Sequence, residues 1–258
     1  MPLKTRGHVV DIDAVRAFWD EHVCGDVFTH LTERLSKEYL DEVRHNRFHY
    51  EYHLMPFLHR VARAGRTVLE VGCGMGMDLA ELATLGCQVT GVDLSPQSLQ
   101  VTQRYFTLVG LEAELRVSNA EALDFSNATF DVVYSFGVLH HTPNIEQALS
   151  EVHRVLRPGG KAFLMFYSRY SLNNLAHVLL RIPYESPRNW QMDAPITRTF
   201  SKQEVQHLLQ HFAQVRIKKA YLFGAGWRPL ADIVPQWINS SLGRFLGWHW
   251  MIEAQKPE

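Results

Sequence analysis

Three alternating glycines mark the stretch of sequence with the clearest chemical meaning. Gly72, Gly74 and Gly76 directly follow the β-branched and aliphatic run at 67–71, and the residues after them begin a helical pattern. Glycine reaches positive φ without a clash and lets a ligand approach the backbone, while a helix N-terminus presents free N–H groups. This strand, turn and helix predict a ligand-binding loop, although a turn that merely needs glycines would show the same letters.

The spacing of these glycines limits the class of ligand that the loop is expected to bind. A dinucleotide-binding loop needs G-x-G-x-x-G, whereas here the third glycine comes one residue earlier. Glu70 stands two residues before the first glycine, and Cys73 provides a small side chain inside the loop. Asp93 follows a second strand-like run at 87–92, where a carboxylate can accept hydrogen bonds from both hydroxyls of a ribose. A surface acid in a turn is the alternative for Asp93.

Two histidines follow the strand-like run at 130–135. Ligands of open α/β sheets sit at the carboxyl ends of the strands, and histidine titrates near neutral pH, so His140 and His141 are candidate general bases. His141 is preferred because His140 is nearer to the strand; packing histidines are the alternative. The pair His207/His211 has i, i+4 spacing but no nearby acid or third ligand, so no metal site is predicted.

Further blocks continue the pattern in a fixed order. They are Ser118–Phe125, Phe130–Ser135, Val138–His141 and Leu156–Gly160. Together with the glycine loop and Asp93, these blocks resemble the class I S-adenosylmethionine (SAM)-dependent methyltransferases, and within them the small-molecule, methyltransferase type 11-like group. The resemblance covers about 100 residues, from Val68 to Tyr167.

The resemblance implies SAM as the cofactor and S-adenosylhomocysteine (SAH) as its product. The glycine loop would pass under the methionine part of SAM, Asp93 would hold the ribose, and the segment from Asn119 would hold the adenine. The family usually has an acid in place of Asn119, but an amide oxygen can still accept from the adenine amino group. The implied cofactor-binding residues are Glu70, Gly72, Cys73, Gly74, Gly76, Asp93, Leu94, Asn119, Ala120, Glu121 and Ser135. Methyl transfer would be an in-line displacement, for which the protein supplies alignment and, for an oxygen or nitrogen nucleophile, a base.

The remaining sequence alternates strand-like and helix-like runs, which predicts an α/β fold with a parallel sheet and helices on both faces. The expected strands are 67–71, 87–92, 113–117, 130–135, 161–167, 215–223 and 248–254. The resemblance implies a Rossmann-like, seven-stranded sheet in the order 3-2-1-4-5-7-6 with the last strand antiparallel. Helices are expected at 31–47 and 201–212, among others. Ser95 and Ser201 are expected N-caps, and Arg157–Gly160 is expected to form a turn.

Two domains are predicted: an N-terminal helical cap or lid at 1–64 and a SAM-binding domain at 65–258, with insertions at about 168–199 and 224–246. Charged and aromatic residues of the cap and the insertions are candidates for an acceptor pocket. They are Arg44, Arg47, Tyr50, Tyr52, Tyr170, Tyr184, Trp190 and Trp227. An arginine there can pair with a carboxylate and a tyrosine can line the pocket. Ordinary packing is the alternative, and the tryptophan-rich segment 224–250 suits a dimer or membrane-surface contact as well.

Composition limits the class of protein. The chain has 258 residues, 46% of them apolar, with 26 basic and 27 acidic side chains, so a buried core is expected and a nucleic-acid partner is not. Cys24, Cys73 and Cys87 have no disulfide or metal spacing and indicate a reducing compartment. Because the start of the sequence lacks a secretory pattern and no apolar run is long enough for a membrane span, a cytoplasmic monomer or homodimer is predicted.

The leading hypothesis is an enzyme that moves a methyl group from SAM to a small-molecule acceptor. The alternative is a non-catalytic SAM-binding module or partner subunit, which the departure at Asn119 favours. A nicotinamide-dependent oxidoreductase is a third hypothesis, and the glycine spacing argues against it. The sequence leaves the acceptor open, and with it whether oxygen, nitrogen, sulfur or carbon is methylated and whether a base is needed.

Overall fold

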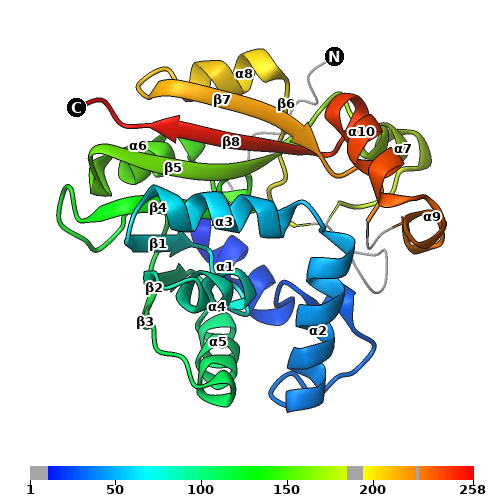
Figure 1. Ribbon diagram of the computed structural model, residues 1–258, viewed down its shortest axis with the longest axis horizontal. Helices are drawn as coiled ribbons and strands as arrows, with labels where there is room; N and C mark the ends of the chain where they lie inside the picture. The colour runs from blue at the N-terminus through cyan, green and yellow to red at the C-terminus, as the bar shows by residue number, and fades with distance from the viewer. Residues whose placement is uncertain (1–10, 185–193, 225–226) are drawn as a thin grey trace.

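A mixed sheet runs through the middle of the protein (Figure 1). The computed structural model describes residues 11–184, 194–224 and 227–258. Its strands are β1 (Thr67–Val71), β2 (Gln88–Asp93), β3 (Glu114–Val117), β4 (Phe130–Phe136), β5 (Leu156–Ser168), β6 (Thr199–Phe200), β7 (Ala213–Ala220) and β8 (His249–Gln255). They lie in the order β3-β2-β1-β4-β5-β8-β7, and the short β6 pairs with β5 outside this path. With β6 left out of the count this is the predicted order, and β8 runs antiparallel to both neighbours, so both predictions are confirmed.

Helices flank the sheet on both faces. They are α1 (Ile12–Glu21), α2 (Lys37–Tyr50), α3 (Leu54–Ala64), α4 (Met77–Thr84), α5 (Pro96–Val109), α6 (Ile145–Val155), α7 (Leu172–Leu180), α8 (Lys202–Leu208), α9 (Arg228–Ile233) and α10 (Gln236–Leu246), with short 3-10 turns η1 (Asp26–Phe28) and η2 (Leu139–His141). The predicted N-caps are confirmed: Ser95 accepts the N–H of Ser98, and Ser201 forms a capping box with Glu204. Such caps satisfy N–H groups that have no partner within the helix.

Alternation along the strands divides the core into two layers. Val68 and Leu69 of β1 are both fully buried but point to opposite faces, because successive side chains of a strand alternate. Val68 joins the layer beneath α2, α3, α4 and α5, and Leu69 joins the layer beneath α6 and α8. The N-terminal helices thus pack on the same core as the strands, and the predicted boundary between cap and second domain stays a prediction.

One expected turn is instead part of a strand. Arg157–Gly160 belongs to β5 and shifts its register against β4, opposite the step from Phe130 to Val132. Gly159 has a φ of +72° and donates its N–H to the carbonyl of Lys256, so the segment is a bulge held by residues near the end of the chain. The prediction of a turn is wrong because proline and glycine suit a bulge equally well.

Other boundaries differ where a cap or an insertion decides them. The helix expected at 31–47 begins at Lys37, because Ser36 accepts the N–H of Tyr39 and so starts α2. The helix expected at 201–212 ends at Leu208. Both predicted insertions contain helices of their own, α7 in the first and α9 and α10 in the second.

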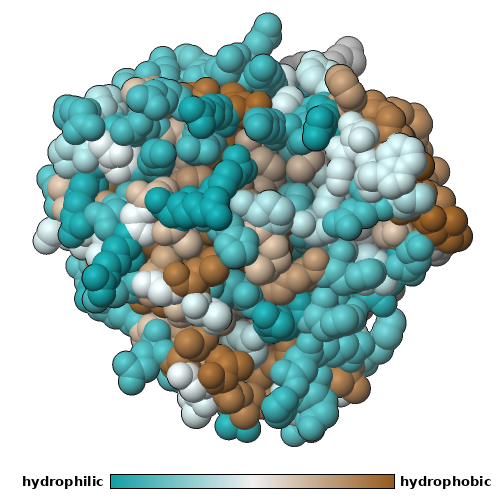
Figure 2. All heavy atoms as spheres, in the orientation of Figure 1, coloured by the Kyte–Doolittle hydropathy of each residue, from teal (hydrophilic) through white to brown (hydrophobic). Residues whose placement is uncertain are grey.

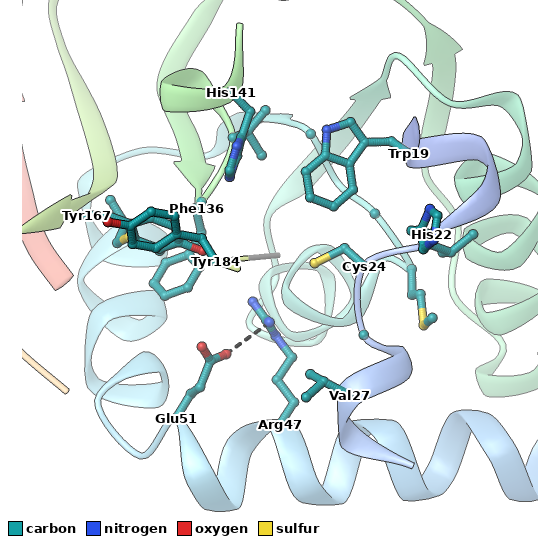
Figure 3. Close-up of a pocket in the computed structure, with 18 of the residues that line it drawn as sticks. Trp19, His22, Cys24, Val27, Arg47, Glu51, Phe136, His141, Tyr167 and Tyr184 are labelled. Carbon is teal, nitrogen blue, oxygen red and sulfur yellow. Dashed lines mark ion pairs between the residues drawn. The ribbon is translucent and has the colours of Figure 1, made fainter. Parts of the chain in front are cut away.

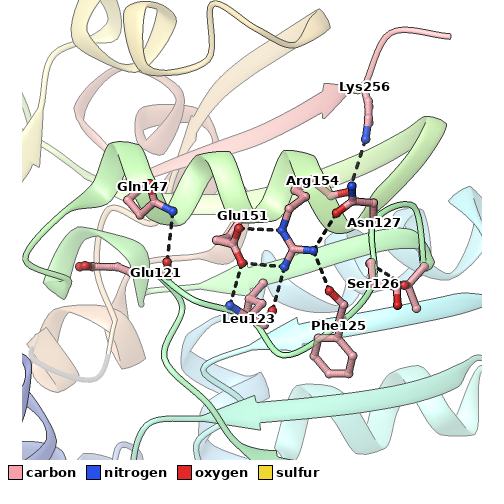
Figure 4. Close-up of polar contacts among 10 residues, drawn as sticks. Glu121, Leu123, Phe125, Ser126, Asn127, Gln147, Glu151, Arg154 and Lys256 are labelled. Carbon is pink, nitrogen blue, oxygen red and sulfur yellow. Dashed lines mark hydrogen bonds and ion pairs between the residues drawn. The ribbon is translucent and has the colours of Figure 1, made fainter.

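Arg154 of α6 fixes the loop between β3 and β4 (Figure 4). Its guanidinium donates to the carbonyl oxygens of Leu123 and Phe125 at 2.8 and 2.6 Å and pairs with Glu151 one turn earlier. Glu151 in turn accepts the N–H of Leu123 at 2.8 Å. Since this loop includes 118–121, α6 holds the predicted adenine-binding segment in place.

The carboxylate of Asp131 on β4 joins this strand to the start of β1. We expect it to contribute to the pH dependence of the free energy of unfolding in acid. This carboxylate accepts the N–H groups of Arg66 and Thr67 at 3.0 and 2.9 Å and pairs with Arg157. Burial opposes the charge, but these donors prevail and lower the pKa of Asp131 to about 2. A depressed pKa stabilises the folded chain above the unfolded value of about 4, and this contribution of about 1–2 kcal/mol, discounted for partial exposure, is lost as the pH falls towards 2.

Replacing Asp131 with asparagine should therefore lower the free energy of unfolding near neutral pH by about 1–2 kcal/mol. The variant should also lose less stability than the wild type when the pH is lowered from about 4 to 2. Urea unfolding at several pH values measures both effects. Equal acid sensitivity of the two proteins would contradict the assigned role.

Apolar side chains are exposed on the helices of the two insertions, over which Figure 2 shows brown surface at the right of the view. They include Leu179 of α7, Ile233 of α9, and Trp237 and Phe245 of α10, each more than two-thirds exposed. Within 11–184, 194–224 and 227–258, no helix has both the length and the apolar character needed to cross a membrane.

Candidate functional site

A cavity of about 930 Å³ lies at the carboxyl ends of β1, β2, β4 and β5 (Figure 3). Its volume is near the upper limit of the roughly 300–1,000 Å³ typical of ligand pockets, and its position is the usual one for ligands of open α/β sheets. We call one side the loop end, which is lined by 70–75, 77, 93–94 and 118–120, whereas Gly76, expected at the cofactor, lies outside the lining. We call the other side the aromatic end, which is lined by Phe136, Tyr167, Tyr184, Tyr221, Trp227 and Trp248.

The three loop glycines have different reasons to be glycine. All three have positive φ, between +54° and +77°. A Cβ on Gly72 would lie 2.2 Å from Val138, and one on Gly76 would lie 2.5 Å from Thr102, so packing requires these two glycines. A Cβ on Gly74 would meet nothing closer than 3.9 Å, although Gly74 lines the cavity. Gly74 thus leaves open space on the side from which a ligand approaches.

Asp93 shapes the loop and also borders the cavity. Its Oδ2 accepts the N–H of Gly74 and its Oδ1 accepts the N–H of Ser95, both at 2.9 Å. Burial raises the pKa of Asp93 despite these two bonds. A carboxylate has about four acceptor positions, so two remain for the hydroxyls of a ribose.

The predicted adenine segment is only partly at the cavity. Asn119 and Ala120 line it, but Oδ1 of Asn119 already accepts the N–H of Glu121 at 2.9 Å. Glu121 lies outside the lining and accepts the N–H of Asn144 at the start of α6. Ser135 is also outside the lining, where its hydroxyl donates to the carbonyl of Val71 at 2.9 Å.

The two candidate bases occupy different positions. His141 lines the cavity, with Trp19 edge-on at 5.3 Å. Its Nδ1 lies 2.6 Å from the carbonyl oxygen of Ile196, which can only accept, so the neutral ring carries its proton on Nδ1 and its lone pair on Nε2. His140 is fully buried behind it, 4.1 Å from the ring of Tyr167, and burial followed by the neighbouring His141 lowers its pKa well below the usual range.

The predicted pocket residues separate into two groups. Three of them line the cavity: Arg47, Tyr184 and Trp227. Four lie elsewhere among the described residues: Arg44, Tyr50, Tyr52 and Tyr170. Arg44 pairs with Glu81 of α4, Tyr50 lies beneath the guanidinium of Arg228, and Tyr170 is 67% exposed. Trp190 falls outside the described residues.

A ladder of stacked rings forms much of the aromatic end. In order, its members are Tyr221, His249, Tyr167, Trp248, Tyr184 and His177, and all six line the cavity. Successive ring centroids are 4.4, 6.1, 4.2, 5.8 and 4.7 Å apart, and successive planes differ by 25° or less. The ladder joins β5, α7, β8 and the segments beside them. Its rings give this end of the cavity an aromatic and largely apolar wall.

A buried charged cluster borders the cavity beside the glycine loop. We define the acidic cluster as Arg47, Glu51, Glu70, Asp78 and Tyr134. Arg47 donates to both carboxylate oxygens of Asp78 at 2.9 and 2.7 Å, and the hydroxyl of Tyr134 donates to the same carboxylate at 2.7 Å. Sequence reasoning missed Glu51 and Asp78. Their signals were that Glu51 comes one helical turn after Arg47 and that Asp78 lies in the first turn of α4, two residues after Gly76.

Comparison with known proteins identifies the central part of the chain. Residues 69–164 match the family model described as a methyltransferase domain. A sterol 4-C-methyltransferase of Caenorhabditis elegans is 32% identical over 95 residues, 36% of this chain and 28% of that protein. A ubiquinone biosynthesis O-methyltransferase of Pseudomonas putida is 35% identical over 127 residues, 49% of this chain and 53% of that protein. The chain thus spans about half of these relatives' length or less.

A solved structure shares the fold over nearly the whole chain. The [4+2]-cyclase SpnF is 15% identical and superposes with a TM-score of 0.61, covering 94% of this chain and 95% of its own. At that identity the likeness shows the fold alone. Because that protein is named a cyclase, the fold by itself does not decide the reaction.

Proposed function

Because residues 69–164 belong to the methyltransferase-domain family, we propose that the whole chain is a SAM-dependent methyltransferase acting on a small molecule. The observation that carries the proposal is one continuous cavity with two different ends. The loop end presents an open glycine and a buried carboxylate at the ends of β1 and β2. The aromatic end provides a separate chamber for an acceptor. We further expect a cytoplasmic monomer or homodimer.

The loop end suits SAM. Gly74 leaves room beside the loop, Asp93 keeps acceptor positions for the ribose, and Ala120 borders the space where adenine would stack. When bound, SAM supplies a methyl group already activated on its sulfonium. The chain's own residues align the acceptor, exclude water, and remove its proton where the nucleophile carries one.

The aromatic end suits a flat and largely apolar acceptor. Aromatic side chains of the ladder favour contact with another aromatic ring, for example edge to face, and apolar side chains of α7 and β5, such as Leu180 and Met165, complete the wall. His141 borders the same space from η2, with its Nε2 in the state that accepts a proton. We therefore expect an acceptor with a hydroxyl or amine on or beside an aromatic ring.

Thermal shift with SAM, SAH and NAD tests this function. Stabilisation by SAM and SAH but not NAD is expected, followed by transfer of a labelled methyl group to members of a panel of small aromatic alcohols and amines. Stabilisation by NAD alone would refute the proposal. Binding of SAM without transfer to any member of a broad metabolite panel would favour the non-catalytic module, for which the internally bonded amide of Asn119 gives some support.

Replacing His141 with alanine should lower turnover roughly 100-fold or more while SAM affinity changes little, because the ring acts on the acceptor. Steady-state rates with an acceptor from the panel, together with calorimetric SAM binding, separate the two effects. His207→Ala, on the exposed side of α8, is the matched control. A wild-type rate for His141→Ala would show that the reaction needs no base at this position.

A further inference from the structure

Glu51 directly follows the last residue of α2 and lines the cavity. Its carboxylate is paired with Arg47. The residue is 7% exposed. Oε2 lies 2.9 Å from Nη1 of Arg47, but this contact lacks the geometry of a hydrogen bond. The other two donor nitrogens of Arg47, Nε and Nη2, are both bonded to Asp78. Figure 3 shows Glu51 and Arg47 side by side at the cavity, with the dashed line marking their ion pair. Within the part of the chain that the structure describes, Glu51 is thus a buried acid whose ion-pair partner, Arg47, is shared with Asp78.

The surroundings of Glu51 contain more acid than base. Within the acidic cluster, the guanidinium of Arg47 faces Glu51, Glu70 and Asp78, and Glu70 also has a buried oxygen with no hydrogen-bond partner. The phenol of Tyr134 faces the cluster from β4 and is bonded to Asp78. Burial raises the pKa of Glu70 well above its ordinary range, so near pH 7 the carboxyl group of the cluster whose charge can change is that of Glu51. A cation bound in the cavity would favour the ionised form of Glu51.

Two nearby histidines add no positive charge. His53, which precedes α3, lies 2.9 Å by its Nε2 from Nδ1 of His249 on β8. Burial, followed by the charge of Arg47, lowers the pKa of His53 to about 3, and burial followed by His53 lowers that of His249 well below the usual range. Both rings are neutral near pH 7, so the charge on Glu51 depends on Arg47, on Asp78 and on whatever the cavity holds.

We propose that Glu51 responds to the charge on the bound cofactor, with its carboxylate ionised when the sulfonium of SAM is present and protonated when the uncharged thioether of SAH takes its place. This proposal rests on the proposed function. Opposite charges attract strongly where water is scarce, so ionised Glu51 strengthens the binding of SAM and contributes nothing to that of SAH. After transfer the site loses its hold on the product without moving any element of the fold.

The resting state of Glu51 suits this role. Burial raises the pKa of Glu51 to about 7, with Arg47 lowering it and Asp78 raising it. A nearby cation favours the ionised form and lowers this pKa, so binding SAM near neutral pH releases a proton from Glu51. Because ligand affinity rises with pH wherever binding releases protons, SAM should bind more tightly as the pH rises towards 7 and then level off.

Calorimetric binding of SAM and SAH to the purified chain between about pH 5.5 and 8.5 tests the proposal. The two ligands share their amino and carboxyl groups and differ in the methyl group and the positive charge on sulfur. Because a methyl group does not titrate, the pH dependence of the ratio of their dissociation constants reports on the sulfur's charge. We expect the preference for SAM over SAH to grow at least about fivefold between pH 5.5 and 7.5 in the wild type. Buffers of different ionisation enthalpy should show proton release with SAM near pH 7 and little with SAH.

Variants assign the effect to one residue. Glu51→Gln should bind SAM with a preference over SAH that no longer changes with pH, and Glu51→Asp should restore part of the dependence. Glu38→Gln, at an exposed position on the same helix, should behave like the wild type. A pH-independent preference in the wild type, or an unchanged dependence in Glu51→Gln, would overturn the proposal. If neither SAM nor SAH binds, the proposed function itself fails, which is a distinct outcome.

Discussion

Replacing Gly72 with alanine is expected to abolish measurable SAM binding and to destabilise the fold. The residue has a φ of +77°, and a new Cβ would lie 2.2 Å from Cγ2 of Val138 and 2.6 Å from its Cγ1. A left-handed conformation costs a non-glycine residue about 1–2 kcal/mol, and overpacking adds about 1–3 kcal/mol. Because Val138 precedes η2, relief of the clash would also displace His141.

Gly110→Ala is a matched control for this experiment. Gly110 has a φ of +69° and a Cβ there would meet nothing within 4 Å, so this variant isolates the backbone cost of about 1–2 kcal/mol. Urea unfolding and calorimetric SAM binding on both variants compare the two sites. If Gly72→Ala loses no more stability than Gly110→Ala and still binds SAM, the close packing of the loop against Val138 is needed neither for stability nor for SAM binding.

Asp93→Ala is expected to weaken SAM binding by at least tenfold, and by more if the loop loosens. Hydrogen bonds to a charged group contribute about 1.5–3 kcal/mol, and this carboxylate would lose those to the ribose. It would also lose the N–H bonds of Gly74 and Ser95, which join the glycine loop to the start of α5. The same reasoning predicts a loss for SAH of similar size, because SAH has the same ribose.

Two comparisons sharpen this test. Asp93→Asn keeps one acceptor oxygen and should fall between the wild type and alanine in affinity for both ligands. Asp124→Ala, at an exposed position in the loop after β3, should bind like the wild type. Unchanged affinity for both ligands in Asp93→Ala would remove Asp93 from the ribose site, and unchanged stability would show that its backbone bonds are dispensable.

Local sequence predicts the loop end well, because its residues are neighbours in the chain. A strand, three glycines and a helix lie within a short stretch, and the position of Asp93 follows from β2 pairing beside β1. The sheet order was available only from the resemblance. Periodicity distinguishes strands from helices, but it does not say which strands become neighbours.

The charged helix α2 shows why side-chain partners are harder to predict. Arg44 and Arg47 are three residues apart, and so are Asp78 and Glu81 on α4. The two helices lie so that Arg44 meets Glu81 and Arg47 meets Asp78. From the sequence, these arginines were expected to pair with the carboxylate of an acceptor. In the structure they pair instead with acidic side chains of α4. This pairing can be predicted only when the relative positions of α2 and α4 are known.

The aromatic ladder could not be predicted from the sequence, for a related reason. Its rings come from β5, from α7 and the residues after it, and from β8 and the segment before it, which are far apart along the chain. Tyr184 was proposed for the pocket singly, while Trp248 and His249 fell in the segment 224–250, which was proposed as a whole for a pocket or an intermolecular contact. Stacking is a property of the assembled sheet edge, and no spacing in the sequence encodes it.

The division of the cavity wall between early and late parts of the chain has an evolutionary consequence. The loop end comes from three segments between residues 70 and 120, all inside the matched domain, whereas α7, α9 and their flanking segments lie after that domain. During evolution the late segments can therefore be lengthened, shortened or exchanged. Such changes would alter the acceptor that is bound while leaving the loop end, where we propose that SAM binds, unchanged. A chimera that carries these segments from a homologue with another acceptor is a natural way to retarget the protein.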